Sequence, residues 1–168
     1  MTTQNFTQTQ VENLFFNAAR KGNTSLLSRF LTAGMDPNHR TKQGYTPLIL
    51  ATYNGHEDAT KILLAHGAQP DLKDEKGATA LAGVAFKNFP ILGQILIEAG
   101  ACVDSFNNAG RTPLMLAVIF GREAMVHLLL HAGANPTLQD NEGLSAIDFA
   151  LRRGNTALAQ IMQANQRE

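Results

Sequence analysis

Large apolar residues recur along the chain in columns that are spaced by 33 residues. The two clearest columns are Phe15, Leu48, Leu81, Leu114 and Ile147, and Phe30, Leu63, Leu96, Leu129 and Met162. Small and polar residues separate the columns, and a stretch rich in Pro, Asp, Asn and Gly follows the second column in the first four copies. A fixed period of roughly 20 to 50 residues is typical of proteins in which similar units stack and bury a shared core. The pattern therefore predicts a repeat protein.

Glycine residues follow the same period. Those that open each copy are spaced by 33 residues and are Gly44, Gly77, Gly110 and Gly143. The clearest phrases after them are Thr46-Pro47-Leu48 and Thr112-Pro113-Leu114. A Gly-Ala pair comes twenty-three residues after each of the first three, at Gly67, Gly100 and Gly133. A divergent copy precedes them with Gly22 and Gly34 in register, so the chain holds about five copies.

Each copy predicts two short helices and an extended loop. In the second copy, Thr46 supplies a hydroxyl cap, and Pro47 stands at the first helical position, where its missing N–H has no partner to lose. That helix ends at Gly55, and a second helix runs from about Glu57 to His66, closed by Gly67 in the C′ position. Pro, Asp, Asn and Gly residues follow without helical periodicity, which indicates turns.

A repeat of 33 residues with Thr-Pro-Leu phrases and Gly-Ala after the second helix resembles the ankyrin repeat, from about Val11 to Ala164. The resemblance is to small, free-standing ankyrin-repeat proteins of the bacterial kind. It implies an all-α solenoid of about five helix-turn-helix repeats joined by β-turn loops. We expect a single domain over 11–164, with a polar lead-in over 1–10 and a tail over 165–168. The expected repeats are 11–43, 44–76, 77–109, 110–142 and 143–164.

The ends of the stack carry polar residues where inner repeats meet a neighbour. Asn17 and Arg29 stand in columns that are otherwise mostly apolar, and Gln163 replaces an aliphatic residue in the last copy. Terminal repeats need a polar outer face to remain soluble. We therefore expect a stack that is closed at both ends.

The third repeat departs from the pattern. It has Ala80 where the second and fourth repeats have proline, and Gly83 lies inside its first helix. Asn88 replaces the glycine between its helices, and Pro90 opens the second helix. A glycine inside a helix costs up to about 1 kcal/mol relative to alanine. We expect this repeat to be the least regular one, for either a structural or a functional reason.

Composition adds a few constraints. The 168 residues carry a formal net charge of zero, so the total indicates neither nucleic acid nor an anionic membrane as a partner. Cys102 is the single cysteine, which excludes an internal disulfide, and we expect it to be a small packing residue. No apolar run approaches the roughly 18 residues that cross a bilayer, and no secretory signal is recognisable. These features favour a cytoplasmic protein without membrane contact.

Catalytic and cofactor motifs are missing from the sequence. It has no phosphate-binding loop, nucleophile elbow or dinucleotide fingerprint. His127 and His131 have the spacing of metal ligands on a helix, but no third ligand lies near them in sequence. We therefore expect no enzyme activity, no cofactor and no metal site.

The family resemblance implies where a partner would bind, because ankyrin stacks use a concave groove formed by the loop tips and the exposed side of each first helix. The positions that map onto this groove carry ten Lys or Arg and only two Glu, although the chain has 14 residues of each sign. Exposed apolar residues accompany the basic ones. The candidate partner-binding residues are Arg20, Lys21, Arg40, Lys42, Tyr45, Tyr53, Lys73, Lys76, Phe86, Lys87, Phe106, Arg111, Ile119, Phe120, Arg152 and Arg153.

These observations predict a monomeric interaction module that binds an acidic protein surface and thereby inhibits, protects or scaffolds a partner such as an enzyme or a toxin. The anchor is expected in the third and fourth repeats, around Phe86, Phe106, Ile119 and Phe120, because aromatic residues most often anchor interfaces. The alternative is a nucleic-acid-binding groove, since basic and aromatic side chains together can hold a single strand. An enzyme is the third and least favoured class of function.

Overall fold

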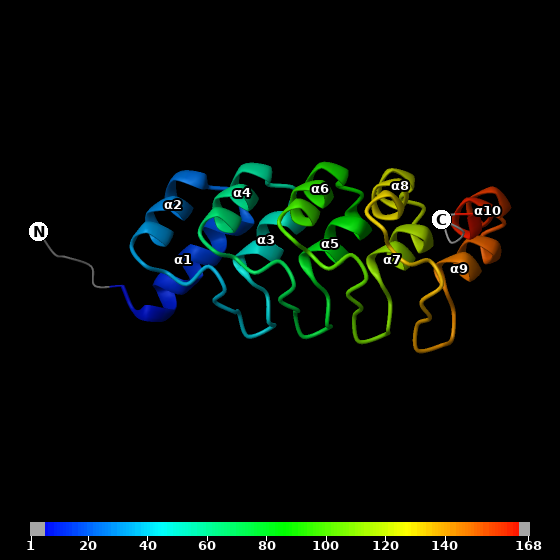
Figure 1. Cartoon of the computed structure of the whole chain (residues 1–168). Helices are drawn as coiled ribbons and strands as arrows, with labels where there is room; N and C mark the ends of the chain where they lie inside the picture. Colours follow the sequence, from blue (N-terminus) through cyan, green and yellow to red (C-terminus); the bar gives the residue numbers. More distant parts are fainter. Residues whose placement is uncertain (1–5, 165–168) are drawn as a thin grey trace, which may run out of the picture.

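The computed structural model describes residues 6–164, which contain ten helices. The helices are α1 (Gln8–Arg20), α2 (Thr24–Thr32), α3 (Pro47–Tyr53), α4 (Glu57–Ala65), α5 (Ala80–Lys87), α6 (Pro90–Glu98), α7 (Pro113–Ile119), α8 (Glu123–His131), α9 (Ala146–Arg152) and α10 (Thr156–Ala164). They form five hairpins in a row, and the long loops between successive hairpins project to one side (Figure 1). The predicted all-α solenoid is confirmed.

Successive hairpins pack in register. The odd-numbered helices contact one another in chain order from α1 to α9, and the even-numbered helices from α2 to α8 form a second row (Figure 1). The predicted tail at 165–168, and residues 1–5 of the predicted lead-in, lie outside the described residues.

The first helix begins earlier than we predicted. Residues 8–10, which we assigned to the polar lead-in, form the first turn of α1. The backbone N–H of Gln10 donates to the hydroxyl of Thr7 at 3.3 Å, and the backbone N–H of Thr7 donates to the side-chain oxygen of Gln10 at 2.8 Å. This reciprocal capping box starts a helix without any apolar residue in its first turn.

Buried hydroxyls begin the remaining odd-numbered helices. Thr46, Thr79, Thr112 and Ser145 are buried N-caps, and each accepts a hydrogen bond from the backbone N–H three residues later. Replacing such a cap by alanine typically costs about 1 kcal/mol. The third repeat keeps its cap at Thr79 despite having lost the proline, so α5 begins in register with α3 and α7.

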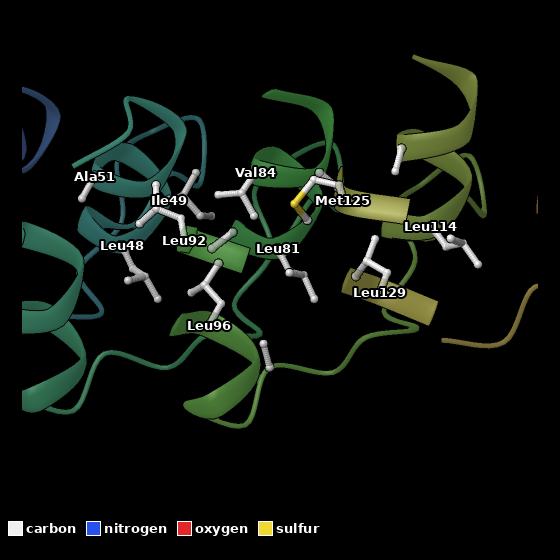
Figure 2. Close-up of a cluster of buried hydrophobic side chains, with 14 of the residues drawn as sticks. Leu48, Ile49, Ala51, Leu81, Val84, Leu92, Leu96, Leu114, Met125 and Leu129 are labelled. Atoms are coloured by element: carbon white, nitrogen blue, oxygen red, sulfur yellow. The ribbon is translucent and has the colours of Figure 1, made fainter. Parts of the chain in front are cut away.

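The core follows the columns seen in the sequence. Leu48, Leu81 and Leu114 are fully buried in the odd-numbered helices, and Leu96 and Leu129 are fully buried in α6 and α8. Figure 2 shows these side chains from successive repeats gathered in one cluster. Burying a leucine side chain contributes roughly 1.5 to 3 kcal/mol. Because the cluster runs through successive repeats, packing between neighbouring repeats contributes to the stability of the stack.

The loops stack on one another through their backbones. The side chains of Asp74, Asn107 and Asp140 each accept hydrogen bonds from the backbone N–H groups two and four residues later, so each loop closes into the same tight turn. Adjacent loops are joined because the N–H of residue 75 donates to the carbonyl of residue 43, and the same bond recurs for 108 to 76 and for 141 to 109. The loop tips therefore form a continuous rim beside the odd-numbered helices.

Polar side chains also tie the second and fourth repeats to the end of the preceding odd-numbered helix. His56 Nε2 lies 2.9 Å from the carbonyl oxygen of Arg20, and Arg122 Nε donates to the carbonyl of Phe86 at 2.9 Å. The third repeat has Phe89 at the corresponding position, which has no side-chain donor, and its ring lies against Gly55. His56 therefore has a structural role, because its ring nitrogen contacts the end of α1 from the repeat that follows.

Two expectations about single residues have different outcomes. Asn17, Arg29 and Gln163 are exposed at the ends of the stack, as predicted. Cys102 is exposed and not a packing residue, because Ala101 before it fills the buried position of the turn after α6. Within residues 6–164, no helix has the length and apolar character needed to cross a membrane.

Candidate partner-binding surface

Three aromatic side chains lie in a row where the odd-numbered helices end. Tyr53 is the last residue of α3, Phe86 is near the end of α5, and Phe120 caps α7. The rings of Tyr53 and Phe86 are parallel within 4° with their centroids 6.5 Å apart. Phe86 meets Phe120 edge to face with a centroid distance of 4.7 Å. We call Tyr53, Phe86 and Phe120 the aromatic ladder; it spans three repeats.

The aromatic ladder is open to solvent. Tyr53 and Phe120 are each 43% exposed, and Phe86 between them is half-buried. The ammonium group of Lys87 lies 4.9 Å from the centroid of the Tyr53 ring, within the range of a cation–π contact. An exposed, contiguous apolar feature next to a positive charge is characteristic of a surface that binds another molecule.

A hollow of about 600 Å³ lies between this ladder and the loop rim. Its walls come from α1, α3, α5 and α7 and from the loops before α3 and α5. It is lined by Arg20, Tyr45, Ile49, Leu50, Tyr53, Asn54, Asp74, Lys76, Ala78, Thr79, Ala82, Gly83, Phe86 and Leu116. Most of these side chains are apolar, and Arg20 and Lys76 are the basic groups among them.

Small residues of the third repeat create the hollow. At the position of Ala78 the second, fourth and fifth repeats carry Tyr45, Arg111 and Leu144. At the position of Ala82 they carry Ile49, Met115 and Asp148, and at the position of Gly83 they carry Leu50, Leu116 and Phe149. Three side chains are therefore shortened together on one repeat, and the surface sinks there. The irregular sequence of the third repeat therefore corresponds to this hollow in the surface.

Several of the basic candidate residues are engaged within the protein. Arg111 donates from Nε to Asp140 at 3.2 Å and from Nη2 to Glu142 at 3.5 Å, and its guanidinium lies 5.6 Å from the ring centroid of Phe149. Arg111, which the sequence predicts as a partner-binding residue, is thus paired with two acidic groups of its own chain. The acidic partners lie in the next loop, which stacking brings into contact.

The surroundings of Asp140 shift the pKa of its carboxyl group. Its burial acts to raise the pKa, but the backbone N–H groups of Leu144 and Glu142 donate to it, and Arg111 adds a hydrogen bond and an opposite charge. The net result is a pKa below the ordinary value of an aspartate. The ion pair between Arg111 and Asp140 therefore persists at neutral pH.

Two more predicted basic residues are held by backbone carbonyls. Lys73 Nζ donates to the carbonyl of Phe106 at 2.7 Å and lies 4.7 Å from the centroid of the Phe106 ring. Arg153 Nη1 donates to the carbonyl of Ile119 at 2.7 Å. Both charges are still close to the surface, but their positions are fixed by the fold.

Five other basic candidates lie mostly in the N-terminal half of the stack. Lys21, Arg40, Lys42, Lys76 and Arg152 are exposed. Among residues 6–164, none of these five has a carboxylate within ion-pairing distance. Four of the five belong to the first two repeats, and only Arg152 lies at the far end.

The apolar candidates do not all converge. Phe106 is 58% exposed at a loop tip and contacts Lys73. It is not part of the aromatic ladder. Ile119 packs partly against the core. The hollow is centred between the second and third repeats, one repeat nearer to the N-terminus than the predicted anchor.

Comparison with known proteins agrees with this architecture. A family model described as ankyrin repeats in three copies matches residues 15–92, 67–140 and 91–167. The chain belongs to the ankyrin-repeat family. A Pseudomonas aeruginosa protein that is named as an ankyrin repeat protein is 41% identical over 56 residues. That match covers 33% of the present chain and spans about a third, 32%, of the relative.

Ankyrin repeats are protein–protein interaction modules. Family geometry predicts the groove positions of this ankyrin protein, but it does not predict the floor of the hollow, which consists of Ile49, Leu50, Ala82 and Leu116. The signal that could have found it was the coincidence of Ala78, Ala82 and Gly83 in one repeat. Among the residues that the structure describes, no group of three or more His, Cys, Asp and Glu side chains is placed to hold a metal ion.

Proposed function

We propose that this ankyrin-repeat protein binds an acidic surface of another protein against its odd-numbered helices and loop rim. The observation that carries the proposal is the exposed aromatic ladder beside a hollow with Arg20 and Lys76 at its edge. Aromatic residues and arginine are the types most enriched in the centres of protein interfaces. A partner that covers this face removes apolar surface from water and gains charge complementarity at its margin.

The distribution of free charge supports an acidic partner. Arg40 and Lys42 lie in the loop before α3 and Lys76 lies in the loop before α5, and none of the three has a carboxylate partner among residues 6–164. The potential of such a group attracts an acidic surface during encounter, although the protein has no net charge. We further propose that the protein acts as a cytoplasmic monomer and that its binding inhibits, protects or scaffolds the partner, for example an enzyme or a toxin.

Matched charge reversals test this proposal. The test variant combines Arg40→Glu with Lys76→Glu and so reverses two positive charges on the binding face. The control variant combines Arg29→Glu with Lys61→Glu and makes the same change on α2 and α4. Both pairs are exposed and alter the net charge equally. The partner is recovered from native lysate with the wild-type protein, and its affinity for each variant is measured by calorimetry. We expect the first pair to weaken binding by about tenfold or more and the second to leave it unchanged. Equal effects of the two pairs would contradict the proposal.

A single-stranded nucleic acid is the alternative ligand, because it also binds basic grooves lined with aromatic rings. The ring contacts favour a protein partner: Lys87 lies near the face of Tyr53, and Phe86 is packed against Phe120, so the ring faces that a base would stack on are partly occupied. Competition separates the two ligands. Displacement of the recovered partner by an oligonucleotide, and not by an acidic protein, would favour the alternative.

A further inference from the structure

Gly83 has no explanation in the fold itself. It lies inside α5 and has no left-handed backbone angle, so the helix does not require a glycine there. A glycine is among the least favourable residues in a helix interior. An added Cβ would meet a single neighbour, the Cδ2 atom of Tyr53 at 3.3 Å, which belongs to an exposed ring.

Gly93 in the next helix is, by contrast, a glycine that the packing of the protein requires. A Cβ at Gly93 would lie 2.8 Å from Cδ2 of Leu128 and 3.0 Å from Cε of Met125. Gly93 is buried, and close packing of α6 on α8 depends on its lack of a side chain. Gly83 faces the hollow instead, so its missing side chain creates open space and no helix contact.

The hollow has a chemical gradient from floor to edge. Leu50, Ala82 and Leu116 make the floor apolar, and Phe86 provides an aromatic wall. Arg20 and Lys76 lie at the edge. Asp74 also lines the hollow, but its Oδ1 is engaged by hydrogen bonds from the backbone N–H groups of residues 76 and 78, both at 2.9 Å. An apolar group with negative charge on either side would satisfy this arrangement.

We infer that the hollow of the third repeat receives one large apolar side chain from an acidic segment of the partner, with carboxylates of that segment near Arg20 and Lys76. The inference rests on the proposed function and identifies the chemistry of the partner segment. It assigns the small residues of the third repeat a role in selecting the partner. The inserted side chain is the anchor of the interface, and anchors of this kind carry most of the binding energy.

The test uses short random peptides displayed on phage and selected on the purified full-length chain. Enriched peptides are synthesised with a fluorescent label, and their Kd is measured by anisotropy. We expect them to share one Leu, Ile, Met or Phe with Asp or Glu on both sides. Gly83→Leu should weaken their binding on the order of thirtyfold, because the leucine fills the space of the anchor. Ala124→Leu, which adds the same side chain on the exposed side of α8, should leave the Kd unchanged.

A double-mutant cycle guards against a misfolded variant. The apolar anchor of the peptide is replaced by alanine, and its loss is measured on wild type and on Gly83→Leu. If the anchor enters the hollow, the replacement weakens binding strongly on wild type and little on the variant. Leucine occupies the equivalent positions of α3 and α7, at Leu50 and Leu116, so α5 can accept it.

Several outcomes overturn the inference. The proposed anchor is excluded if Gly83→Leu and the alanine replacement in the peptide have additive effects on binding. It is also excluded if the enriched peptides lack acidic residues or if the selection yields no binder. Self-association of wild type that Gly83→Leu abolishes would assign the hollow to a second copy of the chain. If binding depends on Arg40 and Lys76 but not on Gly83, the inference fails and the proposed function stands. If it depends on none of these residues, both fail.

Discussion

The Nε atom of Arg122 donates to the backbone carbonyl of Phe86 at 2.9 Å, which joins the start of α8 to the end of α5. The carbonyl is one of the last in its helix and has no partner within the helix. Because the donor is charged, it also complements the negative end of the helix dipole. This contact adds to the helix packing that joins the repeat carrying Phe86 to the next one.

Replacing Arg122 should therefore destabilise the stack. Arg122→Met keeps an unbranched side chain but removes the donor, and we expect a loss of about 1 to 2 kcal/mol in the free energy of unfolding. Lys61→Met, on the exposed face of α4, should change stability by less than about 0.5 kcal/mol. Urea unfolding followed by circular dichroism measures both. Equal losses in the two variants would show that the contact contributes nothing.

The same substitution should have opposite effects at two helical glycines. Gly83→Ala is expected to raise stability by up to about 1 kcal/mol, because alanine is the better helix former and the exposed Tyr53 ring can move away from the new Cβ. Gly93→Ala is expected to lower stability, because its Cβ would lie 2.8 Å from Leu128 within the packed interface of α6 and α8. Thermal melts of the two variants check this. A stabilised Gly93→Ala would contradict the packing argument.

The fold could be predicted because its determinants are local and repeated. A buried leucine such as Leu81 recurs at the same position in every inner repeat, and a hydroxyl cap such as Thr79 recurs before each odd-numbered helix. Caps and columns of this kind depend on neighbours a few residues away or one period away. The start of α1 was missed because its capping box, Thr7 with Gln10, lies outside the apolar pattern.

The candidate surface could be predicted only in part. Family geometry led to Tyr53 and Phe86, but it could not show that Arg111 is paired with Asp140, since that contact depends on how two loops stack. The hollow was missed because it arises from side chains that are absent. Periodicity reports which residues are present in a column, and the combined effect of Ala82 and Gly83 becomes visible only when the neighbouring repeats enclose them.

Asp140 should make stability depend on pH. Its pKa in the folded protein lies below the ordinary value, so its contribution is present above the unfolded pKa and is lost as the pH falls through the folded pKa. Asp140→Asn should remove this part of the dependence, and Asn107 shows that asparagine supports the same turn in the preceding loop. Urea unfolding between about pH 5 and pH 2 compares the two proteins. We expect the wild type to lose more stability with acid; parallel curves would contradict the assignment.

The aromatic ladder and the loop-tip phenylalanine should differ in their importance for binding. Phe86→Ala removes a wall of the hollow together with its contacts to Tyr53 and Phe120. We expect it to weaken binding of the recovered partner by about 2 kcal/mol or more. Phe106→Ala removes a more exposed ring that lies outside the hollow and contacts Lys73, so its effect should stay below about 1 kcal/mol. Calorimetry with the recovered partner measures both, and melting curves verify that each variant is folded. If Phe106→Ala loses more binding free energy than Phe86→Ala, the anchor of the interface lies at the loop tips and not at the hollow. The reason is that a folded variant loses this much binding free energy only when the replaced side chain contacts the partner.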